Sequence, residues 1–322
     1  MSVARFAAAA CGLATAGCES ILGLGDPTLA VICGDGRPTT TRQFVIDSFD
    51  APTDASEAYR LAFDVDNDGT RDNTVFESLA TFGSAVPELE LQPTINSLLA
   101  GGSLLQLLES ELGDSCAQTT LYLGEDRDIP LNPTDNFSGE ESFRVVGTPR
   151  GRMFGARVEH AVFGGPNGSS ELRLPLFGST APIDLPLVEA QIRYIVNDDG
   201  AVEGAIGGAI RADVVDGVVL PSLAQALQDV VTRDCSGGTP PLCCPDMSGG
   251  RTVVNVFDDN EDCVISIDEI RGDGLIQSIF APDVDLYNGG VLEPNVDGID
   301  DAASIGLGFT AVNAFFLTPT SP

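Results

Sequence analysis

The residue types that could do chemistry begin in FDVDNDGTRDN (63–73), where acidic side chains recur at nearly every second position. Such closely spaced like charges repel one another unless a cation lies between them. Calcium takes about six to eight oxygen ligands, and a loop supplies them from positions 1, 3, 5 and 7 when a glycine makes the sharp turn at position 6. Counted from Asp64, aspartates fill positions 1, 3, 5 and 9, Gly69 fills position 6 and Thr70 fills position 7. We therefore expect Ca²⁺ to bind Asp64, Asp66, Asp68, Thr70 and Asp72.

The first loop lacks the acid that would complete a full calcium-binding loop. Position 12 is Val75, where a bidentate glutamate is expected, and Glu77 lies two residues beyond. The loop therefore resembles the DxDxDGxxD calcium loops of thrombospondin type 3 repeats more than an EF-hand. The alternative interpretation is an Asp/Gly turn that is solvated by water.

A second loop, VFDDNEDCVISIDEI (256–270), resembles an EF-hand loop, with an apolar residue at position 8 and an acid at position 12. Cys263 occupies position 6, and cysteine disfavours the positive φ that glycine accepts there. Either a disulfide holds this turn or the site is weak. The valine-rich VVNV before the loop and the glycines after it predict poor flanking helices, so we expect a structural clasp rather than a sensor that opens. The expected Ca²⁺ ligands are Asp258, Asn260, Asp262, Val264, Ser266 and Glu269.

A third acidic stretch, PDVDLYNGG (282–290) followed by NVDGIDD (295–301), fits no calcium-loop template. We interpret it as turns and solvated loop.

Catalytic signatures are weak in this sequence. The single histidine, His160, falls on the apolar face of a predicted strand, which favours a core histidine over a Ser-His-Asp hydrolase. GxSxG, HExxH and Gly-rich phosphate-loop motifs do not occur. The remaining enzyme hypothesis is a carbohydrate-active hydrolase that uses two carboxylates, although no spacing among the 48 acids marks a pair.

The charge balance limits the partners. The chain has 48 acids against 16 bases, all of them arginine, and a net charge of −32. Such a surface repels nucleic acid, so we exclude nucleic-acid binding as a main role. It suits a protein that meets cations, or one kept soluble by its charge.

The N-terminus predicts export. Residues 1–17 contain Arg5 and a short apolar run, and TAGC, which ends at Cys18, resembles the lipobox of bacterial lipoproteins. The rival interpretation is ordinary signal-peptide cleavage at the A-x-A site of residues 14–16. We expect lipidation of Cys18, a tether over 18–40, and an outer-membrane lipoprotein of the cell envelope, periplasmic or surface-exposed.

Cysteine parity supports the lipoprotein. Of eight cysteines, cleavage before Cys18 removes Cys11, and lipidation occupies Cys18, which leaves six for three disulfides. Proximity suggests that the cysteines between 235 and 263 pair mostly among themselves and leave Cys33 for Cys116. Zinc is the competing use, but CxxC spacing is missing.

The elements that must position these loops are mainly strands. Alternation predicts a hairpin of 156–162 and 171–177 joined by a turn at 164–170, a strand at 188–196, and a closing strand at 304–311. Helical patterns occur at 74–82, 93–101 and 221–234. We expect a jelly-roll-like antiparallel β-sandwich with a few short helices, in which a β-rich domain of 41–235 packs with a Cys-rich segment of 236–322.

Taken together, the lipobox with ESILGLGDPTL, both calcium loops and NVDGIDDAASIGLGFTAV resemble an uncharacterised family of surface lipoproteins from myxobacteria. The resemblance implies envelope location and calcium and brings no known activity. We expect a calcium-binding, lipid-anchored protein with a structural, adhesion or ligand-binding role, whose partner is a polysaccharide or a surface protein.

Overall fold

Eight of the strands form a closed antiparallel sheet, an eight-stranded β-barrel. The computed structural model describes residue 33 and residues 39–82, 91–175, 182–198, 200–235, 238–240, 242–245 and 248–317. The predicted signal peptide and Cys18 lie outside the described residues. Strand accounts for 41% and helix for 26% of the described residues, which confirms the mainly β class.

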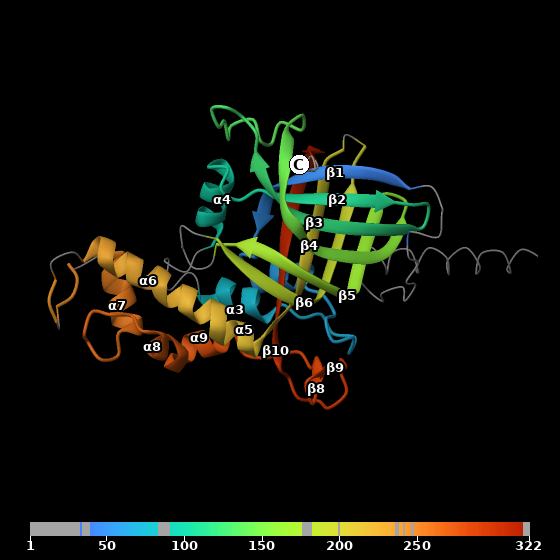
Figure 1. The fold of residues 1–322 in the computed structure, drawn as a ribbon. Helices are drawn as coiled ribbons and strands as arrows, with labels where there is room; N and C mark the ends of the chain where they lie inside the picture. Colours follow the sequence, from blue (N-terminus) through green and yellow to red (C-terminus); the bar gives the residue numbers. More distant parts are fainter. Residues whose placement is uncertain are drawn as a thin grey trace, which may run out of the picture.

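The barrel order is β4-β3-β2-β1-β10-β7-β6-β5, and β5 returns to pair with β4 (Figure 1). The strands are β1 (Thr40–Asp50), β2 (Gln106–Leu112), β3 (Cys116–Asp126), β4 (Ser142–Val158), β5 (Ala161–Leu174), β6 (Ile183–Val196), β7 (Val202–Arg211) and β10 (Ala302–Asn313). Short β11 (Phe315–Leu317) adds to β4 in parallel, and β8 (Tyr287–Asn288) pairs with β9 (Val291–Leu292) outside the barrel. Strand β10 lies between β1 and β7, so the predicted Cys-rich segment of 236–322 contributes one strand to the barrel wall.

The expected β-sandwich is therefore wrong. Half-buried strands alternate in the same way in a sandwich and in a barrel, so the pattern could not decide between them. The deciding contact is the pairing of β4 with β5. Gly155 makes that contact close, because a Cβ there would overlap the carbonyl oxygen of Phe163.

The barrel interior is a packed core. Phe44, Phe49 and Phe309 are no more than 1% exposed. The Tyr194 hydroxyl lies 2.6 Å from Ser110 Oγ and 2.9 Å from Thr119 Oγ1, so this buried phenol has polar partners.

Most of the helices gather beyond one end of the barrel (Figure 1), whereas the helix of Ala55–Leu61 packs against two strands of its wall. The helices are α2 (Ala55–Leu61), α3 (Thr74–Phe82), α4 (Gln92–Ala100), α5 (Ala212–Val214), the π-helical η2 (Val215–Val219), α6 (Leu220–Asp234), α7 (Gly249–Phe257), α8 (Ile267–Gly272) and α9 (Gly274–Ile279). These bounds agree with the helical patterns at 74–82, 93–101 and 221–234. The continuous helical run Ala212–Asp234 is long and apolar enough to cross a membrane by length and composition, which alone is weak evidence. Its stripe of Leu223, Leu227 and Val231 is buried, as in the core helix of a globular protein.

The predicted hairpin around residues 164–170 is also wrong. Residues 161–174 form the single strand β5, and the turn lies earlier, at Glu159 and His160. Glu159 has a φ of 55°, and His160 is exposed rather than in the core. The glycines at 164 and 165 produce register shifts within β5 instead of a turn.

Three disulfides join cysteines in the described part of the chain, and they confirm the pairing expected from proximity. Cys33 pairs with Cys116. Cys235 pairs with Cys244, and Cys243 pairs with Cys263.

Candidate metal centres

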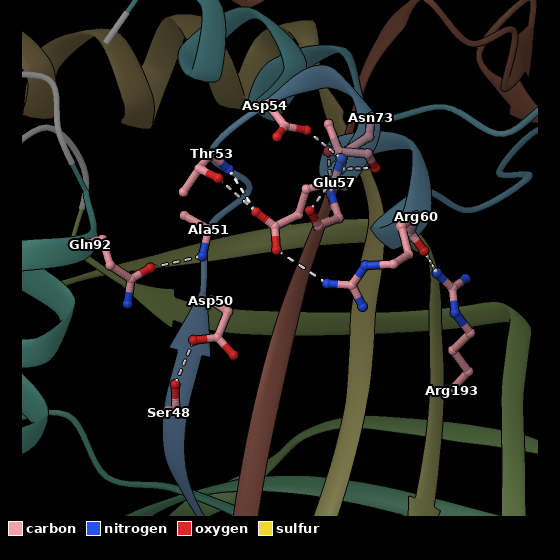
Figure 2. A network of polar contacts seen from close by, with 12 residues as sticks. Ser48, Asp50, Ala51, Thr53, Asp54, Glu57, Arg60, Asn73, Gln92 and Arg193 are labelled. Atoms are coloured by element: carbon pink, nitrogen blue, oxygen red, sulfur yellow. Dashed lines mark hydrogen bonds and ion pairs between the residues drawn. The ribbon is translucent and has the colours of Figure 1, made fainter. Parts of the chain in front are cut away.

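The first acidic loop lies on the outer face of β7 and β10, after α2. Asp54 begins α2 by accepting a hydrogen bond from the Glu57 amide at 2.9 Å (Figure 2). At the other end of α2, Arg193 of β6 donates to the carbonyl oxygens of Arg60 at 2.6 Å and of Ala62 at 2.9 Å. A cation at a helix C-terminus satisfies its last carbonyls, so Arg193 fixes where the loop begins.

Packing against glycine brings the loop close to the barrel. The Phe63 ring packs so closely on Gly207 that a Cβ on this glycine would lie only 2.6 Å from a ring carbon. The Arg193 guanidinium lies 4.2 Å from the centre of the same ring, on its face. Phe63 is 5% exposed and Val65 is 1% exposed, so the apolar residues on either side of Asp64 face the barrel.

The end of the loop is fixed by Asn73, which is 4% exposed. Its amide donates to the Gly306 carbonyl at 2.8 Å and accepts from the Gly306 amide at 2.8 Å. The Asp72 amide also donates to the Phe63 carbonyl at 2.8 Å, which closes the loop at its neck. The four aspartates therefore sit on a rigid base.

The structure brings all four aspartates of the first loop together. Each offers a carboxylate oxygen, and these oxygens all lie within 4.8 Å of one another. Asp64 Oδ1 and Asp72 Oδ2 are buried and have no hydrogen-bond donor. An unpaired buried acceptor is costly, so these two oxygens fit a bound cation. Glu77, in the first turn of α3, does not belong to this group.

Main-chain amides hold the carboxylates in place. Gly69 N donates to Asp64 Oδ2 at 3.2 Å, Asp68 N to Asp66 Oδ1 at 3.2 Å, and Thr70 N to Asp68 Oδ1 at 2.6 Å. Gly69 has a φ of 90°, which explains the glycine at position 6. The expected role of the Thr70 carbonyl stays a prediction.

Three carboxyl groups of the first loop have raised pKa values, because they are at least partly buried and lie close to one another. Burial, followed by the charges of Asp283, Asp66, Asp68 and Asp64, raises the pKa of Asp72 to about 7. Burial also raises the pKa of Asp64 and of Asp66 above the ordinary value for aspartate. A divalent cation would reverse these shifts by favouring the ionised carboxylates.

The second loop repeats the hydrogen-bond pattern of the first. The amide at position 6, from Cys263, donates to Asp258 Oδ2 at 2.9 Å. The position 5 amide of Asp262 donates to Asn260 Oδ1 at 2.9 Å, and the position 7 amide of Val264 donates to Asp262 Oδ1 at 2.8 Å. The same three donor–acceptor relations occur in the first loop, so the two loops share one backbone design.

The disulfide interpretation of Cys263 fits this geometry. Cys263 has a φ of 70°, and its bond to Cys243 ties the strained turn to the segment after α6. The expected poor entering helix is wrong, because α7 (Gly249–Phe257) enters the loop. Val253, Val254 and Phe257 are buried, so packing overrides the weak helix propensity of valine. The exit helix α8 is short and ends at Gly272, where the glycines were expected to break it.

The carboxylates of the second loop converge less than those of the first. Asp258, Asp262 and Glu269 do not belong to an acidic group within 4.8 Å. Glu269 Oε2 accepts from the Ser266 amide at 2.9 Å and from Ser266 Oγ at 2.8 Å, which makes a capping box for α8. Glu269 Oε1 is buried without a donor and is the oxygen left for a ligand.

The third acidic stretch contains turns, as expected, but it is not a solvated loop throughout, because Val284, Asp285 and Leu286 are no more than 3% exposed. Asp285 Oδ2 accepts from the amides of Asp297 at 3.1 Å and Gly298 at 2.7 Å. The stretch also packs on the first loop, since the Asp285 amide donates to Asp66 Oδ2 at 3.3 Å. No pattern in the sequence predicts this contact, which joins residues 219 positions apart.

Sequence reasoning missed a second group of converging acids, in the long connection between β3 and β4. Asp128, Asp135 and Glu141 bring carboxylate oxygens within 4.8 Å of one another. Their only sequence signal is the density of acids over 125–141, because the spacing follows no template.

No family model, curated protein or solved structure matches this chain. The resemblance to myxobacterial surface lipoproteins therefore stays a prediction, and function must be argued from the site itself.

Proposed function

We propose that this protein is a calcium-binding, non-catalytic module of the cell envelope, held to a membrane through a lipid on Cys18, with a structural, adhesion or ligand-binding role. Calcium at the first loop locks α2, the loop and the segment around Asp285 onto the outer face of the barrel. The second loop takes a second, weaker ion that joins α7 to α8.

One observation carries the proposal: four carboxylates converge within 4.8 Å, and two of their buried oxygens have no donor. Hard oxygen ligands and a local charge of about −4 favour a divalent cation such as Ca²⁺. Binding to the folded state alone stabilises it by mass action, so even a loose site of about 10⁻⁴–10⁻³ M suffices where extracellular calcium is abundant.

The hydrolase hypothesis gains no comparable support. A pocket of about 320 Å³ beside the first loop has one acidic lining residue, Glu203. Hydrolysis of a glycosidic bond by the two-carboxylate mechanism needs a facing pair.

Thermal unfolding tests the calcium proposal. We expect millimolar Ca²⁺ to raise the melting temperature of the exported, oxidised protein and a chelator to reverse the rise. Asp64→Asn with Asp68→Asn should abolish most of the shift, whereas Asp114→Asn, an exposed acid outside both loops, should keep it. An equal calcium shift in the double variant and in wild type would refute a site at the first loop.

A further inference from the structure

The pocket of about 320 Å³ lies on the outside of the barrel and does not use the calcium ligands. Its floor is formed where β5, β6 and β7 meet, and its wall is formed by the end of α2 and the first loop. The volume is at the small end of the roughly 300–1,000 Å³ that ligand sites occupy. Because packed side chains fill the barrel interior, this outer pocket offers room that the interior core does not.

The floor of the pocket is largely apolar. Phe163 of β5 and Ile195 of β6 line it, and Ile195 is 45% exposed. A large aliphatic side chain left this open in a concave site offers a surface for an apolar ligand body.

The wall is basic in a strongly acidic protein. Arg60, Arg71 and Arg193 line the pocket from α2, the first loop and β6, although the whole chain has 16 bases against 48 acids. The Arg60 guanidinium forms an ion pair with Glu57 at 3.2 Å, and the Arg193 guanidinium donates a hydrogen bond to a carbonyl oxygen at the end of α2 (Figure 2). These contacts hold both guanidinium groups in defined positions. The Arg71 guanidinium lies 5.6 Å from the centre of the Tyr59 ring. Guanidinium groups bind carboxylates through paired hydrogen bonds, and the acid on the floor, Glu203, disfavours a second negative charge at the other end of the ligand.

We propose that this pocket binds a small organic monocarboxylate whose remaining body is apolar or aromatic. The carboxylate meets Arg60 and Arg71, and the body lies on Phe163 and Ile195. Arg71 stands between Thr70 and Asp72, so an ion in the loop fixes the backbone that carries this arginine. This coupling to calcium rests on the proposed function, whereas the pocket itself does not.

Isothermal titration calorimetry with 2-naphthoate tests the pocket in the full mature chain with millimolar Ca²⁺. We expect binding of 2-naphthoate, with 2-naphthamide, the neutral probe of the same shape, at least tenfold weaker. Arg71→Gln should weaken 2-naphthoate binding about tenfold. Ile195→Glu, at an exposed position that tolerates a polar residue, should abolish it. Arg144→Gln, an exposed arginine of β4 outside the pocket, should bind as wild type does.

Absence of 2-naphthoate binding, equal affinity for the amide, or wild-type affinity in both Arg71→Gln and Ile195→Glu would overturn the pocket. Repeating the titration in chelator separates the two proposals. If chelation weakens 2-naphthoate binding threefold or more in wild type but not in the variant with Asp64→Asn and Asp68→Asn, the coupling is supported. If chelation leaves 2-naphthoate binding by wild type unchanged, the coupling alone is overturned. A calcium shift in melting temperature without any 2-naphthoate binding overturns the pocket and leaves the calcium site standing.

Discussion

At the scale of the residue, Asp72 carries the charge conflict of the first loop. Burial and the neighbouring aspartates raise the pKa of Asp72 from 3.8 to about 7. The metal-free folded protein therefore binds a proton in this range that the unfolded chain releases, so the free energy of unfolding falls as pH rises from about 4 to about 7. Asp72→Asn should remove this loss. We expect the metal-free variant to exceed metal-free wild type by about 1–2 kcal/mol at pH 8, discounted for partial exposure, and to match it near pH 4.

Urea unfolding in chelator over this pH range measures the effect. Asp114→Asn is the control, because it removes one exposed acid elsewhere and should keep the wild-type pH slope. With saturating calcium at pH 8, we expect wild type to have the higher free energy of unfolding, since only wild type then has all the proposed ligands. A wild-type pH slope in metal-free Asp72→Asn would show that Asp72 titrates normally.

Residue spacing predicted the convergence of the four aspartates because they are neighbours in the chain. Within nine residues, the local turn that includes Gly69 is enough to bring the carboxylates near one another, and the four converge as expected. The group of Asp128, Asp135 and Glu141 depends on the course of a long connection, which spacing does not encode. The contact of Asp285 with Asp66 depends on tertiary packing and was equally invisible.

At the scale of the element, local patterns predicted most helices and strands but not how the strands join. The alternation of 188–196 lies within β6, and the stripe of 221–234 lies within α6, because each pattern reports one buried face. The predicted position of the hairpin turn was wrong because a glycine-rich bulge and a turn share the same composition. The observed turn is made by Glu159, which takes a positive φ although it is not a glycine. The sequence patterns did not predict closure into a barrel, because closure depends on pairing between strands rather than on any one strand.

Substitution of Gly155 tests the pairing of β4 with β5 that closes the barrel. A Cβ at this position would overlap the carbonyl oxygen of Phe163, so Gly155→Ala must separate β4 from β5 where they pair. We expect the free energy of unfolding to fall by about 2–3 kcal/mol, as for other overpacked positions. Chemical denaturation measures this loss, and amide exchange should show it in β4 and β5 first.

Gly217 is the matched control for that substitution. A Cβ there meets nothing within 4 Å, so Gly217→Ala in η2 should be neutral or should stabilise by up to about 1 kcal/mol. Equal effects of the two substitutions would mean that β4 and β5 are not closely paired, which would reopen the choice between a barrel and an open sheet.

At the scale of the whole molecule, the net charge of −32 opposes the compact state through self-repulsion. Monovalent salt screens this repulsion, since the Debye length falls from about 30 Å at 0.01 M to about 10 Å at 0.1 M. Any cation should therefore stabilise the protein to some extent, and a calcium response alone does not prove a site. The two effects differ in concentration dependence, because a specific site saturates and screening does not.

We therefore expect two additive responses in melting temperature. Sodium chloride should raise it gradually up to several hundred millimolar, and calcium at fixed 0.2 M sodium chloride should raise it further and saturate by a few millimolar. The variant with Asp64→Asn and Asp68→Asn should keep the sodium response, because it retains almost all of the net charge, and lose most of the calcium response. Magnesium should be weaker than calcium at the same ionic strength, since it demands a stricter octahedral shell than this flexible set of carboxylates provides. If magnesium and calcium instead raise the melting temperature equally in wild type and variant, the acids act only as a diffuse charge, and the converging oxygens of the first loop bind no specific ion.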